Sequence, residues 1–289
     1  MSQGNILDKI KNLRELTGAG FKDCKNAIDE NDGDIDKSIE YLRKKGILKA
    51  SKKMERVAAD GLVCVTEKDN NFSIIEVNSE TDFVAKNAEF IKFVEEISEL
   101  SVSNSGKMED ILVAKMENNK QVKENLIALI AKIGEKITLR RCDFFESQNV
   151  INFSYIHSAL KNNIGKIGVL LCLETTKKKD EILEFGKHLA MHIAATSPLS
   201  IDKDSLDQKT LEKEKEIIME ELKNSGKDDK IIDKIAIGKL NKYISENTLL
   251  NQEWILEPKK KVKDILKDVS GNGKIVVKKF VRFKVGEGV

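Results

Sequence analysis

The chain has 289 residues, of which 40% are hydrophobic and 34% are charged, so it is long enough for two or three compact domains. Its 50 Lys and Arg residues nearly balance its 48 Asp and Glu residues, and the formal net charge is +2. This balance argues against a nucleic acid or an anionic membrane as the main partner. The longest apolar run, from Ile167 to Leu173, is far shorter than the ~20 residues of a membrane-spanning helix.

The opening sequence MSQGNILDKI has no apolar core of the kind that directs secretion, so we expect a soluble, cytoplasmic protein. The cysteines are scattered along the chain without a CxxC pair, which argues against a zinc site and against a disulfide framework. We expect them to be reduced and to pack as small hydrophobic residues. They are Cys24, Cys64, Cys142 and Cys172.

Residues 1–46 are predicted to form a separate bundle of three short helices. Apolar residues recur at helical spacing in each helix, and the first helix stops at the sequence TGAG at positions 17–20. Such a small bundle buries little surface, so we expect it to bind a partner and not to house chemistry. The inner positions are Ile6, Leu7, Ile10, Leu13 and Leu16, then Phe21, Cys24, Ala27 and Ile28, and then Ile35, Ile39 and Leu42.

The next segment, residues 47–60, is predicted to be a linker. Its basic stretch KASKKMER, at positions 49–56, lacks a clear hydrophobic period, which is typical of a solvated connection. We therefore expect the bundle to be joined to the rest of the molecule by an independent, exposed segment.

Residues 61–148 are predicted to form an antiparallel sheet covered by helices. Two short runs rich in branched residues, at 61–66 and 72–77, are separated by the turn sequence KDNN and indicate a β-hairpin. The remaining predicted elements are a helix capped by Asn87, a helix at 122–133 and a strand at 137–145.

The order strand, strand, helix recurs about 94 residues later, within residues 149–289, and Glu80-Thr81 and Glu174-Thr175 fall at matching places. We therefore predict an α+β fold whose core consists of two related subdomains, each an antiparallel sheet with helices. An antiparallel helical hairpin resembling a short coiled coil is predicted as an insertion at about 208–246, with the sequence NSG at 224–226 between its arms.

Groups that could carry covalent chemistry are sparse. His188 and His192 lie four positions apart on a predicted helix and could share a metal ion, but neither an HExxH motif nor a third ligand is evident. We favour packing or surface roles for both, with a metal-dependent enzyme as an alternative. The sequence has no GxxxxGK[ST] loop and no nucleophile elbow, so we expect no direct nucleotide binding, no cofactor and no catalytic residue.

One segment, VNSETDFVAKN at 77–87, stands out at a predicted junction of strand and helix. An acid and a large aromatic side by side, Asp82 and Phe83, can form a protruding wedge on such a short connection. The alternative is that Phe83 pins the helix to the sheet while Asp82 accepts hydrogen bonds from backbone amides at the helix start.

Several segments together resemble the bacterial translation elongation factor Ts family, and the similarity extends over nearly the whole chain. The segments follow the family order, which makes their combination far more specific than any one of them. They are LRELTGAG at 13–20 with DCK at 23–25, NSETDFVAKN at 78–87, IGE at 133–135 with LRR at 139–141, Tyr155 and His157 with IGVL at 167–170, HLAMHIAA at 188–195 with Pro198, and VRFKVGEG at 281–288.

The resemblance implies a guanine-nucleotide exchange factor for the GTPase elongation factor Tu, which would disturb the partner's magnesium and phosphate site and release GDP. It also implies that residues 1–46 are a ubiquitin-associated-like domain that docks on the GTPase through Lys22 and Asp23. It assigns the intruding wedge to residues 81–84, and a second intruding position to His157. The wedge residues are Thr81, Asp82, Phe83 and Val84.

Because the sequence stops at Val289, just past the GEGV ending, we expect an extra C-terminal helix of longer relatives to be missing. The alternative function is a non-catalytic interaction module of other specificity, which would bind a ubiquitin-like or RNA partner through residues 1–46. The near-neutral charge and the absence of interleaved aromatics in the lysine runs argue against nucleic acid as that partner.

Overall fold

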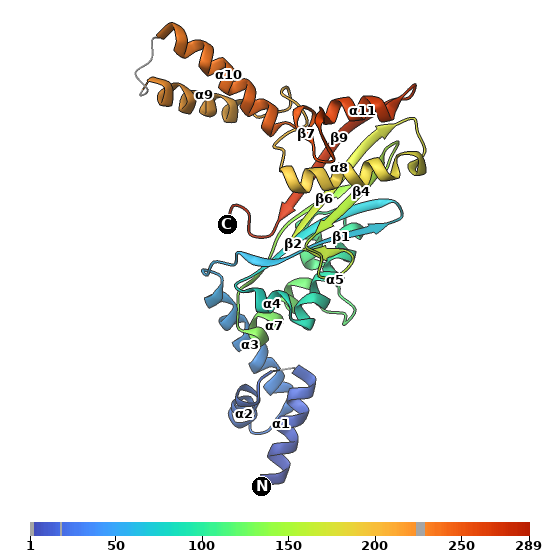
Figure 1. The fold of residues 1–289 in the computed structure, drawn as a ribbon. Coiled ribbons are helices and arrows are strands. Elements are labelled where there is room, and N and C mark those ends of the chain that lie inside the picture. The colour runs from blue at the N-terminus through green and yellow to red at the C-terminus, as the bar shows by residue number, and fades with distance from the viewer. Residues whose placement is uncertain (1–2, 18, 224–228) are drawn as a thin grey trace.

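The structure is a computed structural model that describes residues 3–17, 19–223 and 229–289. The molecule is elongated, with the N-terminal helices at one end, two sheets in the middle and a helical hairpin that projects from the other end (Figure 1). Gly18 of the predicted break at 17–20, and the whole of the predicted break at 224–226, lie outside the described residues. No helix within the described ranges is long and apolar enough to cross a membrane.

Helices α1 (Gln3–Thr17), α2 (Phe21–Glu30) and α3 (Ile35–Lys53) form the N-terminal bundle around buried Leu13, Cys24 and Ile28, as predicted. The apolar residues at the outer positions of α1 and at the start of α2 are exposed, so their prediction as inner positions is wrong: Ile6, Leu7, Leu16 and Phe21. The third helix does not end at residue 46, so the expectation of an independent linker over 47–60 is wrong for its first part. Ala50 is buried in the core of the following sheet domain, and this burial stabilises the extra helical turns.

The first sheet has the order β3-β2-β1-β5 and antiparallel neighbours. Asp69 and Asn70 both adopt positive φ, which suits the tight turn between β1 and β2. Helices α5 and α7 cover one face, and Asn87 caps α5 by accepting hydrogen bonds from two backbone amides, as predicted. The elements are β1 (Asp60–Lys68), β2 (Asn71–Ser79), α4 (Asp82–Ala85), α5 (Ala88–Ser103), α6 (Met108–Val113), α7 (Val122–Ile133) and β3 (Ile137–Phe145).

The second sheet has the order β4-β6-β9, so its second strand is central, as β2 is central among β1, β2 and β3. Short strand β5 (Ile164–Gly165) lies in the second half of the chain but pairs with β1, which corrects the prediction of a self-contained half from residue 149. The other elements are β4 (Ile151–His157), β6 (Ile167–Thr175), η1 (Lys179–Ile182), α8 (Leu183–Thr196), η2 (Leu249–Asn251), β7 (Glu253–Trp254), β8 (Glu257–Lys261), α11 (Val262–Ser270) and β9 (Ile275–Lys284).

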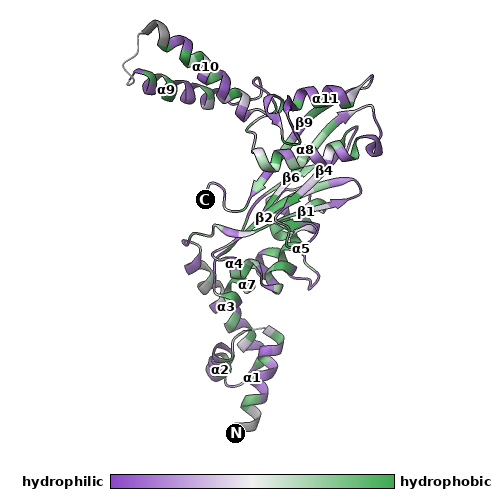
Figure 2. Cartoon of the chain, viewed as in Figure 1, coloured by the Kyte–Doolittle hydropathy of each residue, from purple (hydrophilic) through white to green (hydrophobic). Residues whose placement is uncertain are grey.

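The two sheets share an apolar layer, to which Ile74 of β2, Leu170 of β6 and Phe283 of β9 contribute. The strands at the centre of the molecule are accordingly the most continuously apolar part of the ribbon (Figure 2). Fully buried Glu76 also joins the two halves, because its carboxylate accepts hydrogen bonds from Arg141 at 2.6 Å and from the backbone N–H of Gly286 at 2.9 Å. The sheets are therefore held together as one body.

Helices α9 (Gln208–Lys223) and α10 (Asp229–Asn247) form the projecting hairpin predicted at about 208–246. Buried Ile218 and Ala236 belong to the narrow apolar seam between the two arms. The outer faces are mixed apolar and polar along both helices (Figure 2). A narrow seam of this kind is typical of a short antiparallel coiled coil.

Candidate partner-binding site

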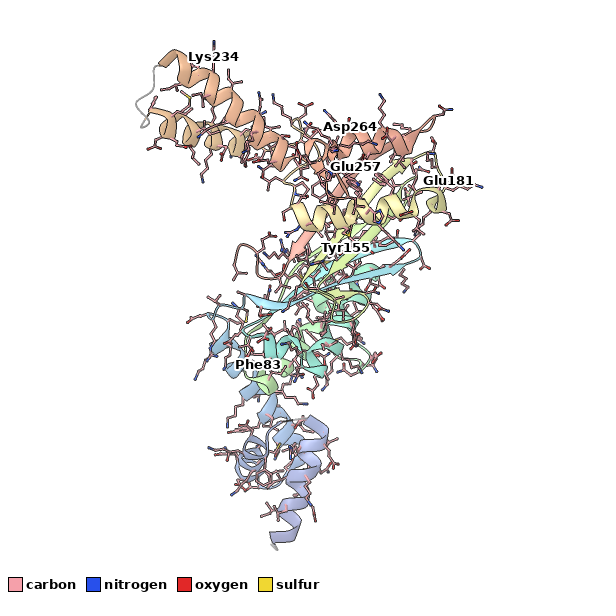
Figure 3. All side chains as sticks on the ribbon, viewed as in Figure 1. Phe83, Tyr155, Glu181, Lys234, Glu257 and Asp264 are labelled. Carbon is pink, nitrogen blue, oxygen red and sulfur yellow. The ribbon has the colours of Figure 1, made fainter. Side chains whose placement is uncertain are left out.

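Phe83 lies on α4, a four-residue helix between β2 and α5, and 79% of it is exposed. Its neighbours Val84 and Ala85 are buried in the first core. The reading in which Phe83 pins the helix to the sheet is therefore wrong, because a side chain in that role would be buried. In Figure 3, Phe83 lies beside the helices of the lower part of the body, and Tyr155 lies among the strands above. Val84 is thus the buried member of the wedge residues 81–84.

Asp82 does not cap α4 with its carboxylate, because the N-cap residue is Thr81. Its Oδ2 accepts a hydrogen bond from Lys86 Nζ at 2.7 Å, and this bond lowers the pKa of the Asp82 carboxyl. The pair is exposed to solvent on both sides, so it contributes little to folding. Asp82 therefore presents an ionised carboxylate beside the exposed ring of Phe83.

The base of the wedge is held by the loop between α7 and β3. Thr81 donates twice to the Glu135 carboxylate, from its backbone N–H at 3.0 Å and from its hydroxyl at 2.9 Å. The backbone N–H of Lys136 donates to Glu80 Oε1 at 2.6 Å, and Arg56 forms an ion pair with Glu80 at 3.2 Å. The loop thus joins the wedge to the end of α3.

His157 ends β4 and is exposed, and its Nδ1 lies 3.2 Å from the hydroxyl of Tyr155. The backbone N–H of the nearby Lys166 donates to the His157 carbonyl at 3.2 Å. The positive charge of Lys166 is also close enough to Asp82 to lower the pKa of that carboxyl further. Lys166 therefore contacts His157 through its backbone and acts on Asp82 through its charge.

Lys22 and Asp23 lie in the first turn of α2. This helix belongs to the bundle at the N-terminal end of the elongated molecule, away from the sheets (Figure 1). Lys22 is exposed. Asp23 lines a cavity of about 490 Å³ between the bundle and α7, together with residues such as Leu42 and Ile127. The structure therefore does not bring these two residues to the wedge, and a partner would have to span both places.

His192 is buried, and both of its ring nitrogens are used within the protein. Nε2 lies 3.0 Å from Gln252 Oε1, and Nδ1 accepts a hydrogen bond from the Ile255 N–H at 3.4 Å. The ring stacks on Trp254 with 5.2 Å between centroids, and burial lowers the pKa of His192. The alternative of a shared metal with His188 is therefore wrong. Among the described residues, no group of three His, Cys, Asp or Glu side chains could hold a metal ion.

Sequence reasoning missed the residues that support the wedge. Glu135 belongs to a motif that matches the family, but it is 54 positions from Thr81, and no local pattern indicates their contact. Arg56, in the segment expected to be a linker, also supports the wedge through its ion pair with Glu80. The available signal was the position of Glu135 within the motif IGE at 133–135, which matches the family.

A sequence model described as Elongation factor TS matches residues 80–287, which is most of the chain. The protein named elongation factor Ts from Methylorubrum extorquens (strain PA1) is 42% identical over 283 residues, covering 97% of this chain and 92% of that protein. Elongation factor Ts from Maricaulis maris (strain MCS10) is 38% identical over 97% of this chain and 91% of its own length. The chain therefore belongs to the elongation factor Ts family, the guanine-nucleotide exchange factors of elongation factor Tu.

Proposed function

We propose that the protein binds the GDP-bound form of elongation factor Tu and inserts Asp82 and Phe83 near the magnesium site of the GTPase. The observation that carries this proposal is the 79% exposure of Phe83 on a short helix whose base is fixed by Glu135. A large aromatic ring held out in water is costly to leave unpartnered, and such residues dominate binding energy at interfaces.

The exchange mechanism requires no covalent step and no nucleotide contact by this chain. The factor acts by binding the nucleotide-free partner more tightly than the nucleotide-bound one, so factor and nucleotide weaken each other's binding by the same factor. Each tenfold weakening corresponds to about 1.4 kcal/mol, and a thousandfold effect needs about 4 kcal/mol of differential binding. Several contacts must share this energy.

The further contacts we propose are His157 on the phosphate-loop side and Lys22 and Asp23 on the bundle. Thr81 and Val84 complete the wedge as its anchor and its buried support. We further propose that the bundle is ubiquitin-associated-like, that the two sheets with their matching strand order are related halves, and that the protein acts in the cytoplasm with no nucleic acid or membrane partner.

The test is release of a fluorescent GDP from elongation factor Tu, with and without the factor, in excess magnesium and in chelator. The fold-acceleration should be smaller in chelator, because nucleotide without magnesium already leaves faster. Equal acceleration in both conditions would rule out the magnesium site as the point of action and would favour the phosphate-loop side near His157.

The alternative, an interaction module of other specificity, makes a different prediction in the same assay. Such a module would leave GDP release unchanged at every factor concentration, even though the protein is folded. Capture of elongation factor Tu on immobilised factor, followed by elution with GDP, would then also fail.

A further inference from the structure

The hydroxyl of Thr81 donates a hydrogen bond to another element and does not accept one from its own helix. Thr81 is the N-cap of α4, and a threonine there ordinarily accepts a hydrogen bond from a backbone amide of the first helical turn. In this structure the Thr81 side chain makes no such capping bond, and its hydroxyl donates to Glu135 Oε1 at 2.9 Å. The start of the wedge helix is therefore fixed from outside, by a residue on another element.

Helix α4 depends on that external support because it is only four residues long. A single turn gains too few hydrogen bonds to offset the cost of ordering its backbone. The two bonds from Thr81 end on the two oxygens of one carboxylate, and hydrogen bonds to a charged acceptor are stronger than neutral ones. Glu135 thus fixes both the backbone and the side chain of the residue two positions before Phe83.

Glu135 is itself held in a rigid setting. It is preceded by Gly134, which ends α7 in a left-handed conformation and whose carbonyl accepts a hydrogen bond from Lys53 Nζ of α3. It is followed by Lys136, whose side chain donates to the Arg56 carbonyl at 2.8 Å. The loop at 134–136 therefore connects the wedge, the end of α3 and α7 at one point.

We infer that Glu135 is a positioning residue for nucleotide exchange, which acts by holding Thr81 and thereby the orientation of Phe83 toward the GTPase. The inference rests on the proposed function of the wedge. It assigns to Glu135 no contact with nucleotide or magnesium. On this inference the effect of Glu135 on exchange passes through Phe83, and a double-mutant cycle tests that coupling directly.

The experiment compares wild type, Glu135→Gln, Phe83→Ala and the double variant in fluorescent GDP release from elongation factor Tu. Glutamine keeps one acceptor but turns an NH₂ group toward the donors of Thr81, so we expect the maximal release rate to fall about tenfold. In the Phe83→Ala background, Glu135→Gln should change the rate by less than about twofold. Equal loss in both backgrounds, or no loss in either, would overturn the inference.

Further variants separate positioning from general damage. Glu135→Asp keeps both acceptor oxygens and should recover part of the lost rate, and Thr81→Val, which removes only the hydroxyl bond, should lose less than Glu135→Gln. Glu117→Gln removes an exposed carboxylate paired with Lys92 at 3.2 Å and should leave exchange unchanged. A rate loss in Glu117→Gln as large as in Glu135→Gln would overturn the assignment.

The outcome for the proposed function remains distinguishable. If wild type fails to accelerate GDP release, the exchange function itself is wrong, and the positioning role falls with it. If wild type accelerates release but Phe83→Ala does so equally well, the wedge is wrong, and any effect of Glu135→Gln then arises elsewhere. If Phe83→Ala is slow and Glu135→Gln is as fast as wild type, only the positioning role is wrong.

Discussion

Replacing Phe83 with alanine should separate folding from exchange, because about one fifth of the residue is buried in the free protein. A buried phenylalanine covers roughly 200 Å², so about 40 Å² of packing is lost, worth about 1 kcal/mol at ~25 cal/mol per Å². If the partner covers the remaining ~160 Å², the complex loses about 4 kcal/mol, or roughly a thousandfold in affinity. The matched control is Phe90→Ala, a fully buried phenylalanine of the next helix, which should cost about 3–5 kcal/mol of folding stability.

The measurements are urea unfolding for stability and fluorescent GDP release, as a function of factor concentration, for exchange. Phe83→Ala should unfold close to wild type and need far more factor for the same release rate. Phe90→Ala should unfold much earlier, while its folded fraction exchanges normally. If Phe83→Ala unfolds as early as Phe90→Ala and exchanges normally per folded molecule, the reasoning from exposure is refuted.

Three further predictions concern the bundle, His157 and His192. Deleting residues 1–46 should raise the factor concentration needed for exchange, because one contact surface is lost. It should also lower the Tm, because the deleted part of α3 packs against α7, and an unchanged Tm would contradict this. His157→Ala should slow maximal exchange while changing stability by under about 0.5 kcal/mol, since the residue is exposed. If its effect and that of Phe83→Ala add strictly in the logarithm of the rate, the two residues act independently of each other. Burial lowers the folded-state pKa of His192 below its ordinary value of 6.5, so the unfolded chain binds more protons near that pH. The free energy of unfolding should therefore fall as the pH drops through about 6.5. Unfolding followed by the fluorescence of the single tryptophan, Trp254, should show this pH dependence in wild type and lose it in His192→Gln.

The sequence by itself determined the elements whose signals are local. The helix at 122–133, the strand at 137–145 and the Asn87 cap all coincide with the structure. Each depends on residues within about four positions of one another, through hydrophobic period or capping. The family was equally accessible, because its motifs are read along the chain in order.

Only the tertiary structure decided where segments meet. The first part of the basic stretch at 49–56 belongs to α3, because Ala50 packs into the core of the first sheet domain. Strand β5 belongs to the first sheet because it pairs with β1. Neither result follows from propensity, since tertiary packing overrides it.

The same distinction applies to the wedge. The sequence placed Asp82 and Phe83 side by side, but its local pattern was compatible with a packed phenylalanine as well as with a protruding one. The structure decided between them, because burial of Val84 and Ala85 in the core leaves Phe83 outside. The support from Glu135 is set by how α7 and β3 bring a loop to the end of β2, and a contact across 54 positions has no local signature.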